Sequence, residues 1–190
     1  MIPTDKMILQ IEEATRLRGW IANSYSQVEY LLGDLILRLR SETIYAEHTQ
    51  TLPHDASNRV RKIKAILAID GPLSAFKTEL EEVLSEISRR HQVRNLLAHG
   101  FCSYHFTPDG DTGFEFQKWH RDKSDGADDR RLIRTFRMLD LQREMETSVA
   151  AAQRALNLYW RLRDHFRWKP RAKDCLIHPK NADPTDAFGG

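Results

Sequence analysis

Hydrophobic residues recur at three- and four-residue steps through most of the chain, which is the spacing of an amphipathic helix. The first such stretch covers residues 4–40, with Thr4 or Asp5 as its N-cap. It predicts a core-facing stripe made of Ile8, Ile11, Thr15, Ala22, Tyr25, Val28, Leu32, Leu35, Ile36 and Leu39. Residues 49–55 predict a loop, and a shorter helix follows over residues 57–69 until Gly71 and Pro72 end it.

The next predicted helix covers residues 73–99. Its early turns are acidic and its late turns are basic, a distribution that suits the helix macrodipole. Gly100 follows the last periodic residue, and glycine is the residue that most often stands just past a helix end.

After residue 100 the pattern changes to the alternation of short strands. Residues 101–106 and 113–119 flank the turn residues 108–111, and residues 130–136 predict a third strand. A last helix fits residues 140–168. The sequence therefore predicts a mainly α protein, a four-helix bundle with a small antiparallel β insert at about 101–137. We expect a single domain over residues 1–168 and an extended or disordered C-terminal tail over residues 169–190.

Composition narrows the class of protein without identifying a function. The 190 residues are 41% hydrophobic and 29% charged, which is typical of one soluble globular domain. No apolar run reaches the roughly 18 residues of a membrane span, and the N-terminal residues do not resemble a signal peptide. Two cysteines rule out a disulfide scaffold and favour a cytoplasmic protein. The net charge of +2 does not by itself indicate nucleic-acid binding.

Candidate chemistry lies at the end of the helix predicted over residues 73–99. On a helical wheel, His91, Arg94 and Asn95 fall within roughly 60° of the apolar stripe that contains Leu80, and His99 lies near its edge. An apolar stripe that becomes polar in its last turns predicts a cleft or an interface, because burying an unpaired arginine is very costly.

Glu29 offers Arg94 a partner, since it lies on the apolar face of the first helix, between Tyr25 and Leu32. A plainer interpretation stands beside this one. Basic residues at a helix end, followed by glycine, also complement the helix dipole and cap the helix without any further function.

The segment Arg94-Asn95-x-x-x-His99, at the end of the third helix of a four-helix bundle, resembles the HEPN superfamily. The signature of that superfamily is an arginine, then four to six residues, then a histidine, often with a polar residue directly after the arginine. The similarity at the level of the bundle covers about four-fifths of the chain and leaves out the β insert and the tail.

This resemblance implies a metal-independent endoribonuclease that works as a homodimer and needs no cofactor. His99 would be the general base on a ribose 2′-hydroxyl or the acid on the leaving 5′-oxygen, roles that suit histidine with its ordinary pKa of about 6.5. Arg94 would hold the scissile phosphate, and Asn95 would orient the phosphate or the His99 ring. Glu29 and His91 would support them. The products would carry a 2′,3′-cyclic phosphate and a 5′-hydroxyl.

The same resemblance implies a toxin–antitoxin or defence setting, with an antitoxin or a nucleotidyltransferase as partner. Some toxin-type members have a tyrosine two residues after the histidine, which the nucleotidyltransferase modifies. Phe101 occupies that position here and has no hydroxyl, which argues against this mode of control.

The C-terminal part of the last helix is a second candidate for RNA binding. Residues 154–173 hold seven basic side chains against one acid, with aromatic residues between them. Such a stretch could attract the RNA backbone, and the candidate contacts are Arg161, Arg163, Arg167 and Lys169. Alternatively, these residues form an ordinary basic helix end whose aromatic side chains belong to the core or to a dimer contact.

Two Cys-x-x-His pairs, at residues 102–105 and 175–178, raise the question of a zinc site. Residues three apart on a strand point to opposite faces, so Cys102 and His105 do not fit one metal ion, and we expect no metal. No Walker A loop, GxGxxG, GxSxG or HExxH motif occurs. Their absence argues against the common nucleotide hydrolases, dehydrogenases, serine hydrolases and zinc proteases.

Two functions therefore remain open: the endoribonuclease, and a non-catalytic HEPN-like bundle that binds RNA, a nucleotide or a protein partner. Exposure of Arg94 and His99 in a groove shared by two copies favours the nuclease. Burial of Arg94 against Glu29, with His99 facing no shared cleft, favours the binding module.

Overall fold

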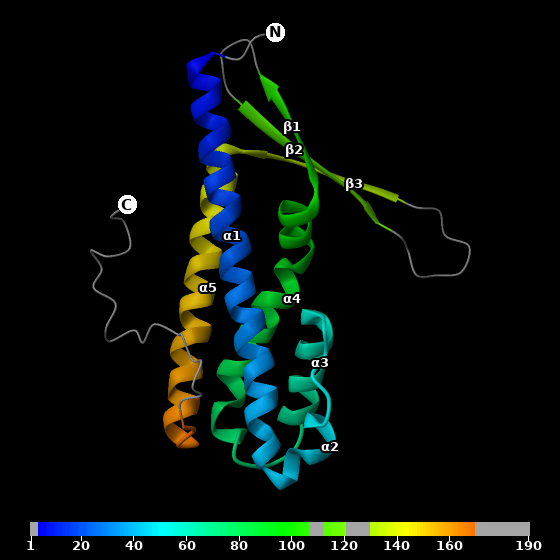
Figure 1. The fold of residues 1–190 in the computed structure, drawn as a ribbon, viewed down its shortest axis with the longest axis vertical. Coiled ribbons are helices and arrows are strands. Elements are labelled where there is room, and N and C mark those ends of the chain that lie inside the picture. Colours follow the sequence, from blue (N-terminus) through cyan, green and yellow to red (C-terminus); the bar gives the residue numbers. More distant parts are fainter. Residues whose placement is uncertain (1–3, 107–111, 121–129, 170–190) are drawn as a thin grey trace.

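The structure, a computed structural model, describes residues 4–106, 112–120 and 130–169 (Figure 1). Over these residues the element order is α1 (Asp5–Arg38), α2 (Ala46–Thr49), α3 (Ala56–Leu67), α4 (Lys77–His99), β1 (Phe101–Phe106), β2 (Thr112–His120), β3 (Arg130–Arg137) and α5 (Met138–His165). Short 3-10 turns lie at Leu39–Ser41, Thr43–Tyr45 and Ser74–Phe76. The predicted mainly helical chain with a small antiparallel sheet before its last helix is confirmed.

Most boundaries differ from the prediction by one to four residues, with α4 beginning at Lys77 rather than at residue 73. The one-turn helix α2 lies in a region to which the sequence assigned no helix, at the start of the predicted loop. The last helix ends at His165 rather than near residue 168, because Arg167 adopts a left-handed backbone conformation with φ of 52°. The predicted turn at 108–111, the loop that precedes β3 and, apart from Lys169, the predicted tail lie outside the described residues.

Side-chain caps explain where two of the helices begin. Thr4 accepts a hydrogen bond from the backbone N–H of Met7 at 3.4 Å, as predicted for the start of α1. Asp55 accepts one from the N–H of Asn58 at 2.8 Å at the start of α3. Each cap satisfies one of the backbone N–H groups that have no partner inside the helix.

Two hydrophobic clusters lie along the length of α1. The first is formed by α1, α3, α4 and α5, with Leu35, Ile63 and Leu84 among its most buried residues. The second joins the N-terminal half of α1 and the end of α4 to the sheet, whose Phe114 and Phe116 are fully buried. In Figure 1, α1 and α5 run side by side and parallel, and the sheet lies at the end of the molecule where both begin.

The predicted stripe on α1 is wrong in its first third. Ile8 is 44% exposed, and Thr15 is also exposed, whereas Ala14, Leu17 and Ile21 are buried. The buried residues continue the face of the helix that carries Tyr25, Val28 and Leu32. Ile8, Ile11 and Thr15 lie roughly 70–130° around the helix from that face.

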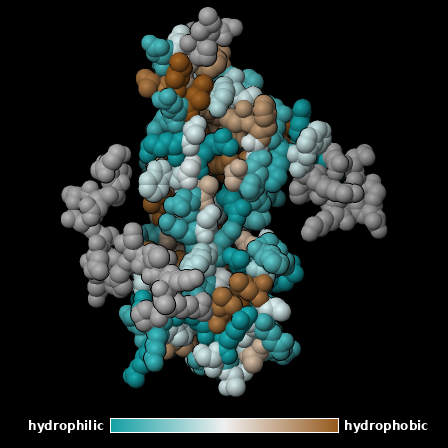
Figure 2. All heavy atoms as spheres, viewed as in Figure 1, coloured by the Kyte–Doolittle hydropathy of each residue, from teal (hydrophilic) through white to brown (hydrophobic). Residues whose placement is uncertain are grey.

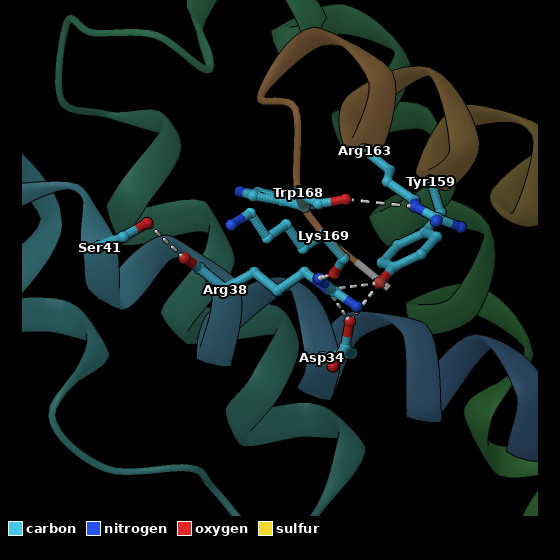
Figure 3. Close-up of polar contacts among 7 residues, drawn as sticks. All are labelled: Asp34, Arg38, Ser41, Tyr159, Arg163, Trp168 and Lys169. Carbon is cyan, nitrogen blue, oxygen red and sulfur yellow. Dashed lines mark hydrogen bonds and ion pairs between the residues drawn. The ribbon is translucent and has the colours of Figure 1, made fainter. Parts of the chain in front are cut away.

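A buried ion pair within α1, between Asp34 and Arg38, is hydrogen-bonded to Tyr159 of α5 inside the first cluster (Figure 3). Arg38 donates from Nε to Asp34 at 2.6 Å and to the Tyr159 hydroxyl at 2.9 Å, and Tyr159 donates to Asp34. Arg38 also donates to the backbone carbonyl of Lys169 at 3.0 Å, which holds the segment after α5 against α1. Burial and the hydrogen bond to Asp34 raise the pKa of Tyr159, so its hydroxyl remains a donor.

The face in view in Figure 2 is mainly hydrophilic, and its hydrophobic residues form separate areas, one of them near the N-terminal end of α1. Among the described residues, no helix combines the length and the apolar composition that crossing a bilayer requires.

Candidate functional site at the end of helix α4

The end of α4 is fixed by a side chain from α1 and by a glycine. Arg18 donates two hydrogen bonds to the carbonyl of Leu97, from Nε at 3.0 Å and from Nη2 at 2.8 Å. This satisfies a carbonyl of the last turn, which has no partner within the helix. Gly100 has extended backbone angles, and a Cβ there would lie 2.4 Å from the carbonyl oxygen of Leu96. Glycine is therefore required by this close approach and not by a left-handed conformation.

The predicted pair between Arg94 and Glu29 is present. The two side chains form an ion pair between α4 and α1, and they are 15% and 22% exposed. The guanidinium also lies 5.9 Å from the centre of the Tyr25 ring. Burial lowers the pKa of Arg94, although a guanidinium keeps its charge at neutral pH. In this state the charge of Arg94 is already balanced by a carboxylate.

The structure joins Asn95 and His91 to the same group. Arg94 donates from Nη1 to the Asn95 side-chain oxygen at 2.9 Å, and the Asn95 amide lies 2.9 Å from Nε2 of His91. Four predicted residues thus form one chain of polar contacts, Glu29–Arg94–Asn95–His91. The Nε–H of Arg94 is buried and has no hydrogen-bond acceptor among the described residues, so one donor of this guanidinium is left unsatisfied.

His99 does not reach this group. His99 is five positions after Arg94, so on an α-helix the two side chains point roughly 140° apart. The His99 side chain is exposed, and within the described ranges it makes no hydrogen bond or ion pair. A single chain therefore does not bring the predicted arginine and histidine together.

A neighbouring network of ion pairs was not predicted from the sequence. One turn before Arg94, Arg90 donates to Glu86 at 2.7 Å and to Glu144 of α5 at 2.8 Å. Burial opposes the charge of Arg90, but these two hydrogen bonds raise its pKa. Burial and the nearby Glu144 carboxylate also raise the pKa of the Tyr25 hydroxyl. The only sign of this network in the sequence is Glu144, near the start of the last helix. Its pairing with Arg90 could not be predicted without knowing that α5 packs beside α4.

The four predicted RNA contacts of the last helix lie elsewhere. They are located at the end of α5 and just beyond it, which Figure 1 places at the opposite end of the molecule from the sheet. Arg161 forms an ion pair with Glu79, and Arg163 lies 4.8 Å from the Trp160 ring. Arg167 and Lys169 are exposed. The structure therefore does not bring these four side chains to His99.

The described part of the chain holds no cluster of three or more side chains suited to a metal ion. Cys102 and His105 lie on opposite faces of β1, as the sequence predicts. Cys102 packs against the second hydrophobic cluster, whereas the His105 ring lies 3.8 Å from Glu115 on the outer face. Cys175 and His178 are outside the described residues.

Replacing Arg94 by alanine is expected to lower the free energy of unfolding by about 1–3 kcal/mol, because the change leaves the Glu29 carboxylate half-buried and unpaired. Urea denaturation of Arg94→Ala, Glu29→Ala and the double variant measures the coupling between the two side chains. We expect the double variant to lose less than the sum of the single variants by about 0.5–2 kcal/mol. Strict additivity would mean that this ion pair contributes nothing to folding.

Comparison with known proteins adds no family to this description: no family model, no curated protein and no solved structure matches the chain.

Proposed function

We propose that the protein is a four-helix, HEPN-type endoribonuclease that cleaves RNA without a metal ion and acts as a homodimer. The observation that carries this proposal is the arrangement at the end of α4. An exposed histidine follows, by five residues, an arginine held in a network with Asn95, His91 and Glu29. Arginine suits a phosphate, and histidine suits proton transfer.

In the proposed reaction, His99 removes the proton from a ribose 2′-hydroxyl, and the 2′-oxygen attacks the adjacent phosphorus. The bond between phosphorus and the 5′-oxygen breaks, and the 5′-oxygen takes a proton from a second acid, for which His99 of the partner subunit is the candidate. Arg94 stabilises the charge that develops on the phosphate. The products are a 2′,3′-cyclic phosphate and a 5′-hydroxyl, so no water and no metal ion is consumed.

A second copy supplies what one chain lacks. Because Arg94 and His99 point in different directions on α4, a composite site needs the histidine of one copy to approach the arginine of the other. The ion pair with Glu29 adds a further requirement, since the phosphate must compete with that carboxylate for Arg94. A cytoplasmic toxin or defence effector that is neutralised by an antitoxin is the setting that fits this proposal.

The second candidate is a non-catalytic bundle of the same type that binds RNA, a nucleotide or a protein partner. The pairing of Arg94 with Glu29 favours it, because a guanidinium that is 15% exposed and already neutralised is a weaker phosphate ligand than a free one. Binding without cleavage is the behaviour that separates this candidate from the nuclease.

The test uses purified full-length protein in excess EDTA with two labelled oligonucleotides of one sequence, an RNA and its 2′-deoxy counterpart. We expect cleavage of the RNA alone, with cyclic phosphate ends identified by mass spectrometry, because only the RNA carries the attacking hydroxyl. A His99→Ala preparation that cuts equally well would identify a contaminating nuclease. If the protein binds varied RNAs but cleaves none of them, the nuclease proposal is wrong and the non-catalytic binding module is supported.

A further inference from the structure

The outer face of the sheet carries exposed aromatic residues. In the register of the strands, Phe101 lies opposite Gln117, which lies opposite Ile133, and Trp119 lies opposite Arg131. Side chains alternate between the two faces of a strand, so Phe101, Trp119, Ile133 and Arg131 share one face. It is the face opposite to Phe114, Phe116 and Phe136, which pack into the second hydrophobic cluster.

These side chains are open to water to an unusual degree. Phe101 and Trp119 are each 70% exposed, and Ile133 is 42% exposed. Trp119 is diagonal to Phe101 and to Ile133 across the sheet, a separation of about 7–8 Å that large side chains can bridge, and Gln117 lies between Phe101 and Ile133. Exposed large apolar side chains gathered on one face make that face a candidate binding surface.

The charges around this surface favour one kind of occupant. On the face that carries Phe101 and Trp119, the charged side chains of the described residues of β2 and β3 are Arg131, directly opposite Trp119, Arg137 further along β3, and the single acid Glu115. Arg131 and Arg137 are exposed. The other basic side chains of these two strands, Lys118, Arg130 and Arg134, alternate onto the opposite face. A second copy of the same surface would bring arginines against arginines. Exposed aromatic rings beside arginines instead suit a single-stranded nucleic acid. Its bases stack on the rings, and its phosphates are attracted by the arginines.

The surface also begins beside the candidate catalytic histidine. Phe101 follows His99 by two residues, so their Cα atoms lie no more than about 7 Å apart. A base stacked on Phe101 therefore places its own phosphates near the end of α4, the position that the proposed cleavage requires.

We propose that Phe101 and Trp119, with Arg131 beside them, form the surface on which single-stranded RNA stacks its bases next to His99. This inference rests on the proposed nuclease function for its connection to cleavage, but stacking itself needs no catalysis. It also differs from the sequence-based expectation, which placed RNA binding at Arg161, Arg163, Arg167 and Lys169. Those side chains lie at the other end of the molecule.

The test measures binding of a fluorescent 2′-O-methyl oligonucleotide, which cannot be cleaved by 2′-hydroxyl attack, to the full-length protein. We expect Trp119→Ala to weaken binding about 5- to 150-fold, the fold-change that follows from the loss of one stacked base. Trp119→Phe should restore most of the affinity. Trp20→Ala is the matched control, because Trp20 is a 41% exposed tryptophan on α1, outside the sheet. Arg131→Ala should reduce the dependence of affinity on salt by about one ion.

The outcomes separate this inference from the nuclease proposal. Trp119-dependent binding without any cleavage of ordinary RNA retains the stacking surface and overturns the nuclease. Cleavage of RNA with equal affinities for the wild type and Trp119→Ala retains the nuclease and overturns the stacking surface. A change in oligomeric state on Trp119→Ala, measured by analytical ultracentrifugation with no change in affinity, would assign this face to contact between copies and likewise overturn the inference.

Discussion

Replacement of His99 by alanine is expected to slow RNA cleavage by a factor of about 10²–10⁴, the range typical for loss of a general acid or base. The fold should be unaffected, because the His99 side chain is exposed and makes no hydrogen bond or ion pair with other described residues. A change of this kind at the surface moves the free energy of unfolding by no more than about 0.5 kcal/mol. The experiment compares initial rates of cleavage and urea denaturation curves for the two proteins.

A matched control is available in the same chain. His54 is an exposed histidine near the start of α3, and its side chain makes no hydrogen bond or ion pair with the other described residues. His54→Ala should keep the cleavage rate of the wild type. If His99→Ala also keeps that rate while the activity co-purifies with the protein, the reacting groups lie elsewhere in the chain and the role assigned to α4 is wrong.

Replacement of Asp34 by alanine is expected to cost about 3–5 kcal/mol of stability, because it leaves the Arg38 guanidinium buried without its carboxylate. Asp34 and Arg38 have side chains that are only 3% and 6% exposed. The change also removes the acceptor of the Tyr159 hydroxyl. The measurement is the midpoint of urea unfolding, with the slope of the transition as a check that the unfolded state is unchanged.

Two further variants test the reason for this loss. Asp34→Asn keeps an acceptor for Tyr159 and should lose less than Asp34→Ala. The double change Asp34→Leu with Arg38→Met removes both charges and fills their space, so it should recover much of the stability. If the double variant is as unstable as Asp34→Ala, the cost comes from packing and not from the loss of the ion pair.

The sequence predicted the elements well because hydrophobic periodicity is a local property. Residues 101–106 were assigned correctly as a strand, and the helix that ends at residue 99 was placed to within a few residues at its start. The pair between Arg94 and Glu29 was also accessible, since each residue interrupts an apolar stripe and a buried charge demands a partner.

The features that could not be predicted from the sequence are those that depend on how the helices and the sheet pack together. The contact between Arg18 and the carbonyl of Leu97 joins residues that are 79 positions apart, and nothing local distinguishes Arg18 from other surface arginines. The apolar residues Ile8 and Ile11 were assigned to the buried face of α1 because pattern alone cannot rank two neighbouring stripes. The orientation of the sheet decides the matter, since Phe114 and Phe116 press on the face that carries Leu17 and Ile21.

The parallel pairing of α1 with α5 has a consequence for biosynthesis. α5 is the main helical neighbour of α1, and it is the last element of the described chain to be made. Throughout translation of the residues between them, α1 cannot bury the surface that α5 later covers, and contacts so distant in sequence form slowly. The nascent chain therefore exposes an apolar helix face until the ribosome has released α5, and this interval is when a chaperone is most needed.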